Sequence, residues 1–277
     1  MSESEVVKII IKPSKGWLSL NLRELWEYHE LAFFLAWRDV SVRYKQTVLG
    51  ILWALIQPFF MMIVFSIFLG KMAKVPSDGL PYPIFAYTAL LPWQYFASVL
   101  SESSNSLVLN QNLIKRVYFP RFILPISNIL APAIDFSIAF VLLLFMMLYY
   151  GIYPTANIIY LPVFLFLSII TSLGVSFWLS ALNIQYRDVR YAIPFLVQLW
   201  MFSSPVVYPA SVIPEKWLWL YSLNPMTGVL EGFRWAILGA GTVEWTSTGL
   251  SIFVALFIFV SGAYFFRRME KTFADMV

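Results

Sequence analysis

A chain of 277 residues that is 60% hydrophobic and only 12% charged is not an ordinary soluble protein, because soluble domains carry roughly 25% charged residues. The absence of cysteine excludes disulfides, thiolate metal sites and cysteine nucleophiles, and the single histidine, His29, leaves little room for a metal cluster. The composition predicts an integral membrane protein, since several runs are long and apolar enough to cross a bilayer.

The first 46 residues are predicted to be a cytoplasmic segment that ends in an interfacial helix. Residues 1–20 are polar and lack the apolar core of a signal peptide. Beyond them, apolar residues recur at three- and four-residue steps, which predicts a helix lying in the membrane interface with one apolar face. Alone, this pattern fits an anchor or packing helix equally well. The predicted face consists of Leu22, Leu25, Trp26, His29, Phe33, Trp37 and Val40.

Residues 47–266 are predicted to form an all-α transmembrane domain of six helices. Uncharged runs mark the spans, and no recurring ten-residue alternation of polar and apolar residues suggests a membrane barrel. The last residues, 267–277, form a predicted cytoplasmic tail. The six spans are expected near residues 47–70, 83–101, 122–150, 157–183, 191–212 and 245–266.

The basic residues orient these spans. All but four of the 19 Lys and Arg residues fall on the side that holds both termini, and the exceptions are Lys71, Lys74, Lys216 and Arg234. Loops that face the cytoplasm carry the excess of Lys and Arg. Both termini are therefore predicted in the cytoplasm, and the basic excess needs no nucleic acid to explain it.

Two connections between spans are longer than a turn requires. Residues 109–121 mix basic, amide and apolar side chains before Pro120, which predicts a short cytoplasmic helix, with a solvated basic turn as the alternative. In residues 214–238, Pro214 and Pro225 each stand where the first residue of a helix is expected, and Asn224 is a good N-cap. They predict two short amphipathic outer helices that dip into the membrane edge, with Glu231 and Arg234 opposite the apolar stripe.

No catalytic motif accompanies these helices. The sequence has no phosphate-binding G-x-x-x-x-G-K-[ST] loop, no H-E-x-x-H and no G-x-S-x-G, so it is predicted not to be an enzyme and to bind no cofactor. Asp135 lies about halfway along the third span, where a carboxylate usually faces protein or water. It is either a functional group or a hydrogen-bonded packing residue. Glu102, at a polar cytoplasmic end, is expected to be solvated.

Aromatic residues make up 18% of the chain. Most Trp and Tyr in membrane proteins form interfacial belts or pack. Some here are predicted to lie well inside the spans, where flat rings with a polar edge can line a path for sugar rings. The candidates for such a path are Trp53, Tyr87, Trp93, Tyr95, Trp178 and Trp200.

The stretch "RDVSVRYKQTVLGILWALIQPF" resembles the entry to the first span in permease subunits of type-2 ABC exporters that move polysaccharides, the O-antigen, teichoic acid and capsule export family. The resemblance continues in "NQNLIKRVYFPR", "NIQYRDVRY", "PVVY" and "LNPM", in the same order and at similar separations. It covers essentially the whole chain. These motifs are specific to the family and not to one substrate.

The resemblance implies a homodimer with two separate ATPase subunits on its cytoplasmic side, which hold the ATP and Mg. An undecaprenyl-type lipid-linked polysaccharide would pass between the two permeases in the cytoplasmic (inner) membrane. Residues 214–238 match the outer gating helices. Arg38, Arg43 and Lys45 at the entrance are predicted contacts for the lipid pyrophosphate. The segment that matches the coupling helix contributes Asn112, Lys115, Arg116, Tyr118 and Arg121 to the predicted ATPase contact.

O-antigen is the first substrate expected, with teichoic acid and capsular polysaccharide as alternatives. An exporter of a drug or small lipid remains a rival within transport. A membrane enzyme acting on lipid-linked sugars is a more distant rival, because it needs paired carboxylates or a histidine and only Asp135 and Glu102 are available. A non-catalytic scaffold would leave the coupling and outer helices without a role.

Overall fold

The computed structural model describes residues 22–45, 50–239, 244–271 and 273, and within these ranges the regular structure is helical, with no strand. This agrees with the all-α membrane fold expected from composition. The helices are α1 (Leu22–Glu27), α2 (His29–Lys45), α3 (Leu52–Phe65), η1 (Ser66–Met72), α4 (Tyr82–Leu109), α5 (Gln111–Arg116), α6 (Ile123–Ser127), α7 (Leu130–Tyr150), η2 (Ala156–Tyr160), α8 (Leu161–Gln185), α9 (Val189–Phe202), η3 (Ala210–Val212), α10 (Glu215–Tyr221), α11 (Pro225–Leu238) and α12 (Trp245–Met269).

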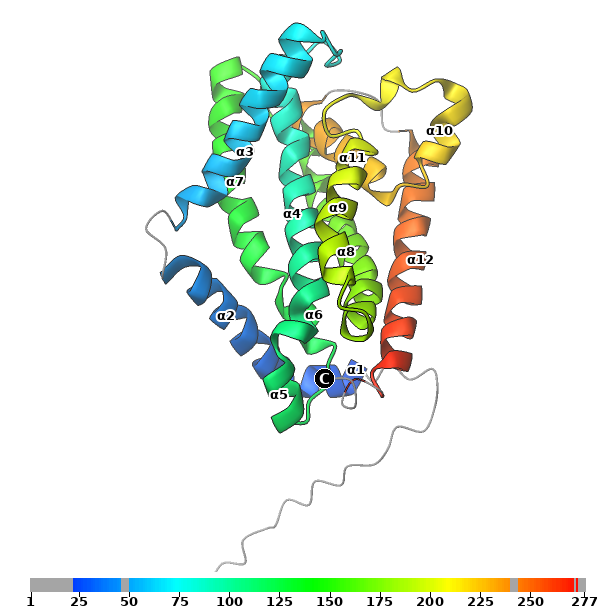
Figure 1. Cartoon of the computed structure of the whole chain (residues 1–277). Helices are drawn as coiled ribbons and strands as arrows, with labels where there is room; N and C mark the ends of the chain where they lie inside the picture. Colours follow the sequence, from blue (N-terminus) through cyan, green and yellow to red (C-terminus); the bar gives the residue numbers. More distant parts are fainter. Residues whose placement is uncertain (1–21, 46–49, 240–243, 272, 274–277) are drawn as a thin grey trace, which may run out of the picture.

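Helix α4 stands at the centre of the bundle, and α3, α7, α8, α9 and α11 pack around it (Figure 1). Its sequence suits this position, because its apolar residues are distributed around the whole helix and not along one stripe. The Tyr87 hydroxyl, fully buried, donates a hydrogen bond of 3.1 Å to the Ala139 carbonyl of α7. The central helix therefore connects the membrane-crossing helices to one another.

Four helical stretches are long and apolar enough to cross a membrane: Leu52–Met72, Ile123–Tyr150, Ala156–Gln185 and Trp245–Met269. They match the predicted first, third, fourth and sixth spans, although residues 47–49 lie outside the described ranges. Helix α4 is long but less apolar, and α9 has only 14 residues. The predicted extent of the fifth span, 191–212, is wrong, because the helix ends at Phe202 shortly before Pro205, whose ring and missing N–H disfavour helix.

The predicted interfacial helix is divided at Tyr28 into α1 and α2. Of the predicted apolar face, Trp26, Phe33 and Trp37 are exposed, whereas Val40 is buried. Leu35 and Ala36, which are not part of the predicted face, are buried with Val40 against the bundle. Helix α2 contacts α6 and α7. The buried side fastens the helix to the protein, and the interfacial role of the exposed aromatic side stays a prediction.

The outer helices α10 and α11 lie at the opposite end of the bundle from α1 and α5 (Figure 1). The predicted apolar stripe of α11 is fully buried, and Arg234, predicted opposite that stripe, is buried as well. Arg234 is 1% exposed, stacks 3.7 Å above the centre of the Phe85 ring, and donates 2.7 Å to the Val206 carbonyl. Its ion pair with Glu231, at 3.0 Å, compensates the buried charge.

Helices α8 and α12 approach closely at glycines. A Cβ atom added to Gly174 would lie 2.7 Å from backbone atoms of Phe259, and one added to Gly262 would lie 2.2 Å from the Gly174 carbonyl oxygen. Small residues allow this approach of helix backbones inside a membrane, where packing replaces the hydrophobic effect. The contact holds the last helix against the core.

We therefore expect Gly174→Val to lower the midpoint of thermal unfolding, by overpacking that costs about 1–3 kcal/mol. The measurement is a thermal unfolding curve of the purified protein in detergent. Gly249→Val is the matched control, because nothing lies within 4 Å of a Cβ atom added there. Equal midpoints for the two variants would contradict the close contact.

Candidate functional site

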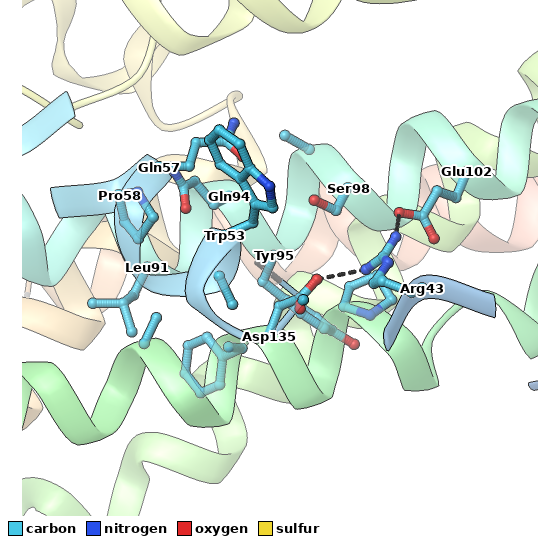
Figure 2. Close-up of a pocket in the computed structure, with 16 residues that line it drawn as sticks. Arg43, Trp53, Gln57, Pro58, Leu91, Gln94, Tyr95, Ser98, Glu102 and Asp135 are labelled. Carbon is cyan, nitrogen blue, oxygen red and sulfur yellow. Dashed lines mark hydrogen bonds and ion pairs between the residues drawn. The ribbon is translucent and has the colours of Figure 1, made fainter. Parts of the chain in front are cut away.

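A cavity of about 410 Å³ opens between α2, α3, α4 and α7 (Figure 2). It mixes apolar walls with amide, hydroxyl and charged groups, which is the usual composition of a ligand-binding pocket. Figure 2 shows Trp53, Gln57 and Gln94 gathered toward one side and Arg43 between Glu102 and Asp135 at the other. The lining residues are Arg43, Gly50, Trp53, Ala54, Gln57, Pro58, Leu91, Gln94, Tyr95, Ala97, Ser98, Glu102, Pro132, Asp135, Phe136 and Ala139.

A charge cluster closes one end of this cavity. The Arg43 guanidinium on α2 donates from Nη1 to Asp135 Oδ2 of α7, at 2.5 Å, and from Nη2 to Glu102 Oε1 of α4. The Tyr44 hydroxyl donates 2.5 Å to the other oxygen of Asp135. Three helices from distant parts of the chain are thus joined by charge-assisted hydrogen bonds, which are stronger than neutral ones.

The cluster contains two carboxyl groups and one guanidinium, and the three side chains are each 29–30% exposed. Burial, together with the hydrogen bond to Asp135, raises the pKa of the Tyr44 phenol above its usual range, so the hydroxyl keeps its proton and remains a donor. The one guanidinium of the cavity is therefore already engaged by two carboxyl groups.

These contacts change two expectations. Asp135 lies in the second turn of α7 and is ion-paired and hydrogen-bonded, as the packing alternative required. Glu102 is not simply solvated, because Arg43 holds it. Arg43 is a poor candidate for the lipid pyrophosphate in this structure, since two carboxylates already neutralise it and would repel an anion.

The other two predicted entrance residues lie outside the cluster. Arg38 bonds to Asp39 at 2.8 Å and donates 3.2 Å to the side-chain oxygen of Asn110, just before α5. This contact connects the interfacial helix to the coupling segment. Lys45 is exposed at the end of α2. Of the three, Lys45 is the one that the described structure leaves open to an anionic group, and its headgroup role stays a prediction.

Two amides in the cavity were missed by the sequence analysis. Gln57 lies on α3 and Gln94 on α4, and neither makes a hydrogen bond to another residue in the part of the chain that the structure describes. Ser98 likewise makes no hydrogen bond within the described residues. The Tyr95 hydroxyl is buried without a partner in the same ranges, and the residue is only 3% exposed. An uncharged polar side chain inside an apolar span, such as Gln57 in "LIQPFF", is the signal that could have found them.

The predicted path aromatics do not lie together. Trp53 and Tyr95 line the cavity. Tyr87 and Trp93 are 0% and 3% exposed inside the subunit and present no surface to a path in this structure. Trp178 stacks on Phe265, with ring centres 4.1 Å apart. Trp200 donates 2.8 Å to Asn224 beside α11, in a separate hollow of the outer side.

A second surface lies at the end of the molecule that carries α1 (Figure 1). Helix α5 is shorter than the predicted 109–121, because Val117 is already extended and Pro120 follows. Asn112, Lys115 and Arg116 are exposed on it, and Tyr118 is exposed just beyond, while Ile114 packs against the bundle. A short helix with one buried and one basic open side can dock a partner while remaining attached to the fold.

Arg121, the fifth predicted coupling residue, is bound within the chain. Its backbone N–H donates 3.0 Å to a Glu270 carboxylate oxygen, and its guanidinium donates to the Glu270 carbonyl. Its guanidinium also lies 5.8 Å from the centre of the Phe273 ring. Arg121 therefore fastens the segment after α5 to the end of α12, and its guanidinium is engaged within the chain.

Removing the Arg43 charge should destabilise the fold. We expect Arg43→Gln to lower the midpoint of thermal unfolding, because Glu102 and Asp135 would face each other with their partner lost, at about 1–3 kcal/mol. Adding Asp135→Asn should restore part of the loss, since the repulsion disappears. Lys45→Gln, a change of the same charge at the exposed end of α2, is the control. Unchanged unfolding of Arg43→Gln would show that the cluster contributes no stability.

Comparison with known proteins identifies the family of this chain. The ABC-2 type transporter family matches residues 30–238. An O-antigen export system permease of Klebsiella pneumoniae is 29% identical over 243 residues, which cover 87% of this chain and 92% of the relative. A second such permease, from Myxococcus xanthus, is 28% identical over 77% of this chain and 82% of its own length.

A third relative is the polysialic acid transport protein KpsM of Escherichia coli, 27% identical over 86% of this chain and 93% of its own length. The family match extends from the interfacial helix α2 to the end of the outer helix α11, and it includes the cavity, the charge cluster and the coupling surface. This chain therefore belongs to the ABC-2 type transporter family.

Proposed function

We propose that this chain is the permease subunit of an ATP-driven exporter that moves a lipid-linked polysaccharide across the cytoplasmic membrane, with O-antigen as the first substrate and teichoic acid or capsule as alternatives. One observation carries the proposal. Relatives named for O-antigen export and for polysialic acid transport each match more than three-quarters of the chain. The common feature of the named substrates is a polysaccharide.

The energy comes from a partner. The sequence has no phosphate-binding loop, so ATP and Mg bind to a separate ATPase subunit. The exposed residues Asn112, Lys115, Arg116 and Tyr118 support docking of that subunit on α5. Arg38 and Asn110 support transmission, because their hydrogen bond joins α2 to the residue that precedes α5.

The topology follows from the same proposal. The four long apolar stretches, with α4 and α9, make six spans, and both termini lie in the cytoplasm of a multi-pass inner-membrane protein. Helices α1 and α5 and the end of α12 lie at one end of the molecule, which supports this orientation (Figure 1). Helix α11, packed inside the outer end, serves as a gating element.

The permease works as a homodimer with two ATPase subunits. Two helices of the bundle offer apolar surfaces to a second copy, to the transport path or to lipid. Phe60 and Phe68 on the α3–η1 stretch and Phe195 and Leu199 on α9 are each more than half exposed. In the dimer, such surfaces face the second subunit, the transport path or lipid. The polysaccharide on its undecaprenyl-type carrier passes between the two copies.

A gene deletion tests this function. Loss of the surface polysaccharide, with its lipid-linked precursor accumulating inside the cell, is the expected result, and the gene on a plasmid restores export. Surface O-antigen, teichoic acid and capsule that all remain at wild-type levels would overturn the proposal. The purified permease should hydrolyse no ATP until the ATPase subunit is added.

Charge reversal on α5 should uncouple the two subunits. We expect Arg116→Glu to abolish export while the protein still inserts into the membrane, because an exposed cation at the docking surface becomes an anion. Surface polysaccharide and ATPase copurification measure the two effects. Lys74→Glu makes the same charge reversal in the exposed loop after η1 and should export normally. Export by Arg116→Glu at the level of Lys74→Glu would remove Arg116 from the docking surface.

A further inference from the structure

We propose that the cavity between α2, α3, α4 and α7 is a subsite that binds an uncharged sugar residue and disfavours acidic ones. The inference rests on the proposed function and narrows its substrate class. Relatives of this chain are named for O-antigen export and for transport of polysialic acid, an acidic polymer. The charge and the unsatisfied polar groups of the cavity distinguish between these two chemistries.

Several polar groups of the cavity have no protein partner among the described residues. Gln57, Gln94, Ser98 and Tyr95 line one cavity, and within the described ranges none of their side chains makes a hydrogen bond. Gln57 is exposed and Gln94 and Ser98 are half-buried, so a ligand in the cavity can reach all three, whereas the Tyr95 hydroxyl is enclosed. A polyhydroxylated ligand would supply donors and acceptors to the two amides and to the Ser98 hydroxyl.

Gln57 is an uncharged polar residue in a membrane-spanning helix. It lies on α3, within an otherwise apolar run, and its side chain is exposed. An amide that faced lipid there would lose its hydrogen bonds to water. Pro58 adds to the polarity, because it lacks the N–H that would bond the carbonyl of Ala54, another lining residue. This side of α3 is suited to a polar occupant.

The Trp53 ring lies on the same side of the cavity as the two amides (Figure 2). The side chain is 55% exposed, so its flat face is available to a ligand. Indole presents an apolar face with a polar edge, which suits the C–H face of a pyranose ring. A volume of about 410 Å³ falls within the usual range of small-molecule sites.

The charged groups of the cavity disfavour an anion. Arg43 is the one cation among the lining residues, and it already bonds the carboxylates of Glu102 and Asp135. A sugar carboxylate or phosphate entering the cavity would find its one cation already engaged and would approach the Asp135 and Glu102 carboxyl groups at short range. Two like charges 4 Å apart repel by about 4 kcal/mol at an effective dielectric constant of 20. An uncharged sugar avoids this repulsion and can donate hydroxyl hydrogen bonds to the carboxylates.

Binding of two matched oligosaccharides tests the proposal. The probes are maltohexaose, which is uncharged, and a hexamer of α2,8-linked sialic acid, which is acidic. Saturation-transfer NMR measures their binding to the complete permease–ATPase complex in nanodiscs. We expect maltohexaose to bind at least about tenfold more tightly, since tenfold corresponds to about 1.4 kcal/mol. Equal or tighter binding of the sialic acid hexamer would overturn the inference.

Variants locate the binding within the molecule. Gln57→Ala and Gln94→Ala should each weaken maltohexaose binding about fivefold, the effect of one lost hydrogen bond, and Trp53→Leu should also weaken it. Gln185→Ala removes an exposed amide outside the cavity and should bind as the wild type does. Gln57 is exposed, so its truncation is not expected to affect folding. Wild-type binding by the Gln57, Gln94 and Trp53 variants would overturn the assignment.

Export in cells separates this inference from the proposed function. If deletion of the gene abolishes export but the Gln57→Ala/Gln94→Ala variant exports and binds like the wild type, the cavity subsite is wrong and the permease function stands. If deletion leaves every surface polysaccharide unchanged, the proposed function fails, whatever the cavity binds. Impaired export by the double variant, with unimpaired export by Gln185→Ala, supports both.

Discussion

The Arg43 guanidinium, held between Glu102 and Asp135, is the interaction on which the rest of the arrangement depends. Without it, the interfacial helix α2 would lose its charged connection to α4 and α7, and the two carboxylates would repel each other. The same contact lies at one end of the cavity and engages its one cation. One ion cluster therefore serves the position of α2, the packing of two transmembrane helices and the electrostatics of the proposed sugar site.

The two ends of the molecule use buried cations differently. At the α2 end, Arg43 joins α2 to α4 and α7, and Arg38 joins it to Asn110, just before α5. At the outer end, Arg234 is almost fully enclosed and holds the loop before α10 through the Val206 carbonyl. The first cluster is partly exposed. In the second, Arg234 is enclosed and its partner Glu231 keeps some exposure, so the ion pair compensates the buried charge and ties α11 to the preceding loop.

The transmembrane core was predictable from the sequence because few structures other than a spanning helix accommodate an uncharged run of about twenty residues. Properties that arise from tertiary contacts were not predictable. Arg43 reaches partners 59 and 92 positions away in the chain, so no local pattern pairs them. Amphipathic periodicity placed Arg234 opposite the apolar stripe of α11, and the surrounding helices bury it there as well. Gln57 and Gln94 form a site only because α3 packs beside α4.

The most direct test of the account is ATP-dependent movement of the polysaccharide itself. Inside-out membrane vesicles would contain this permease, its ATPase subunit and the lipid-linked glycan on the outer surface, and a glycosidase added outside would report which glycan remains accessible. The account predicts that ATP, but not a non-hydrolysable analogue, makes the glycan resistant to the enzyme. Glycan that stays fully accessible while the complex hydrolyses ATP would contradict a role in polysaccharide export.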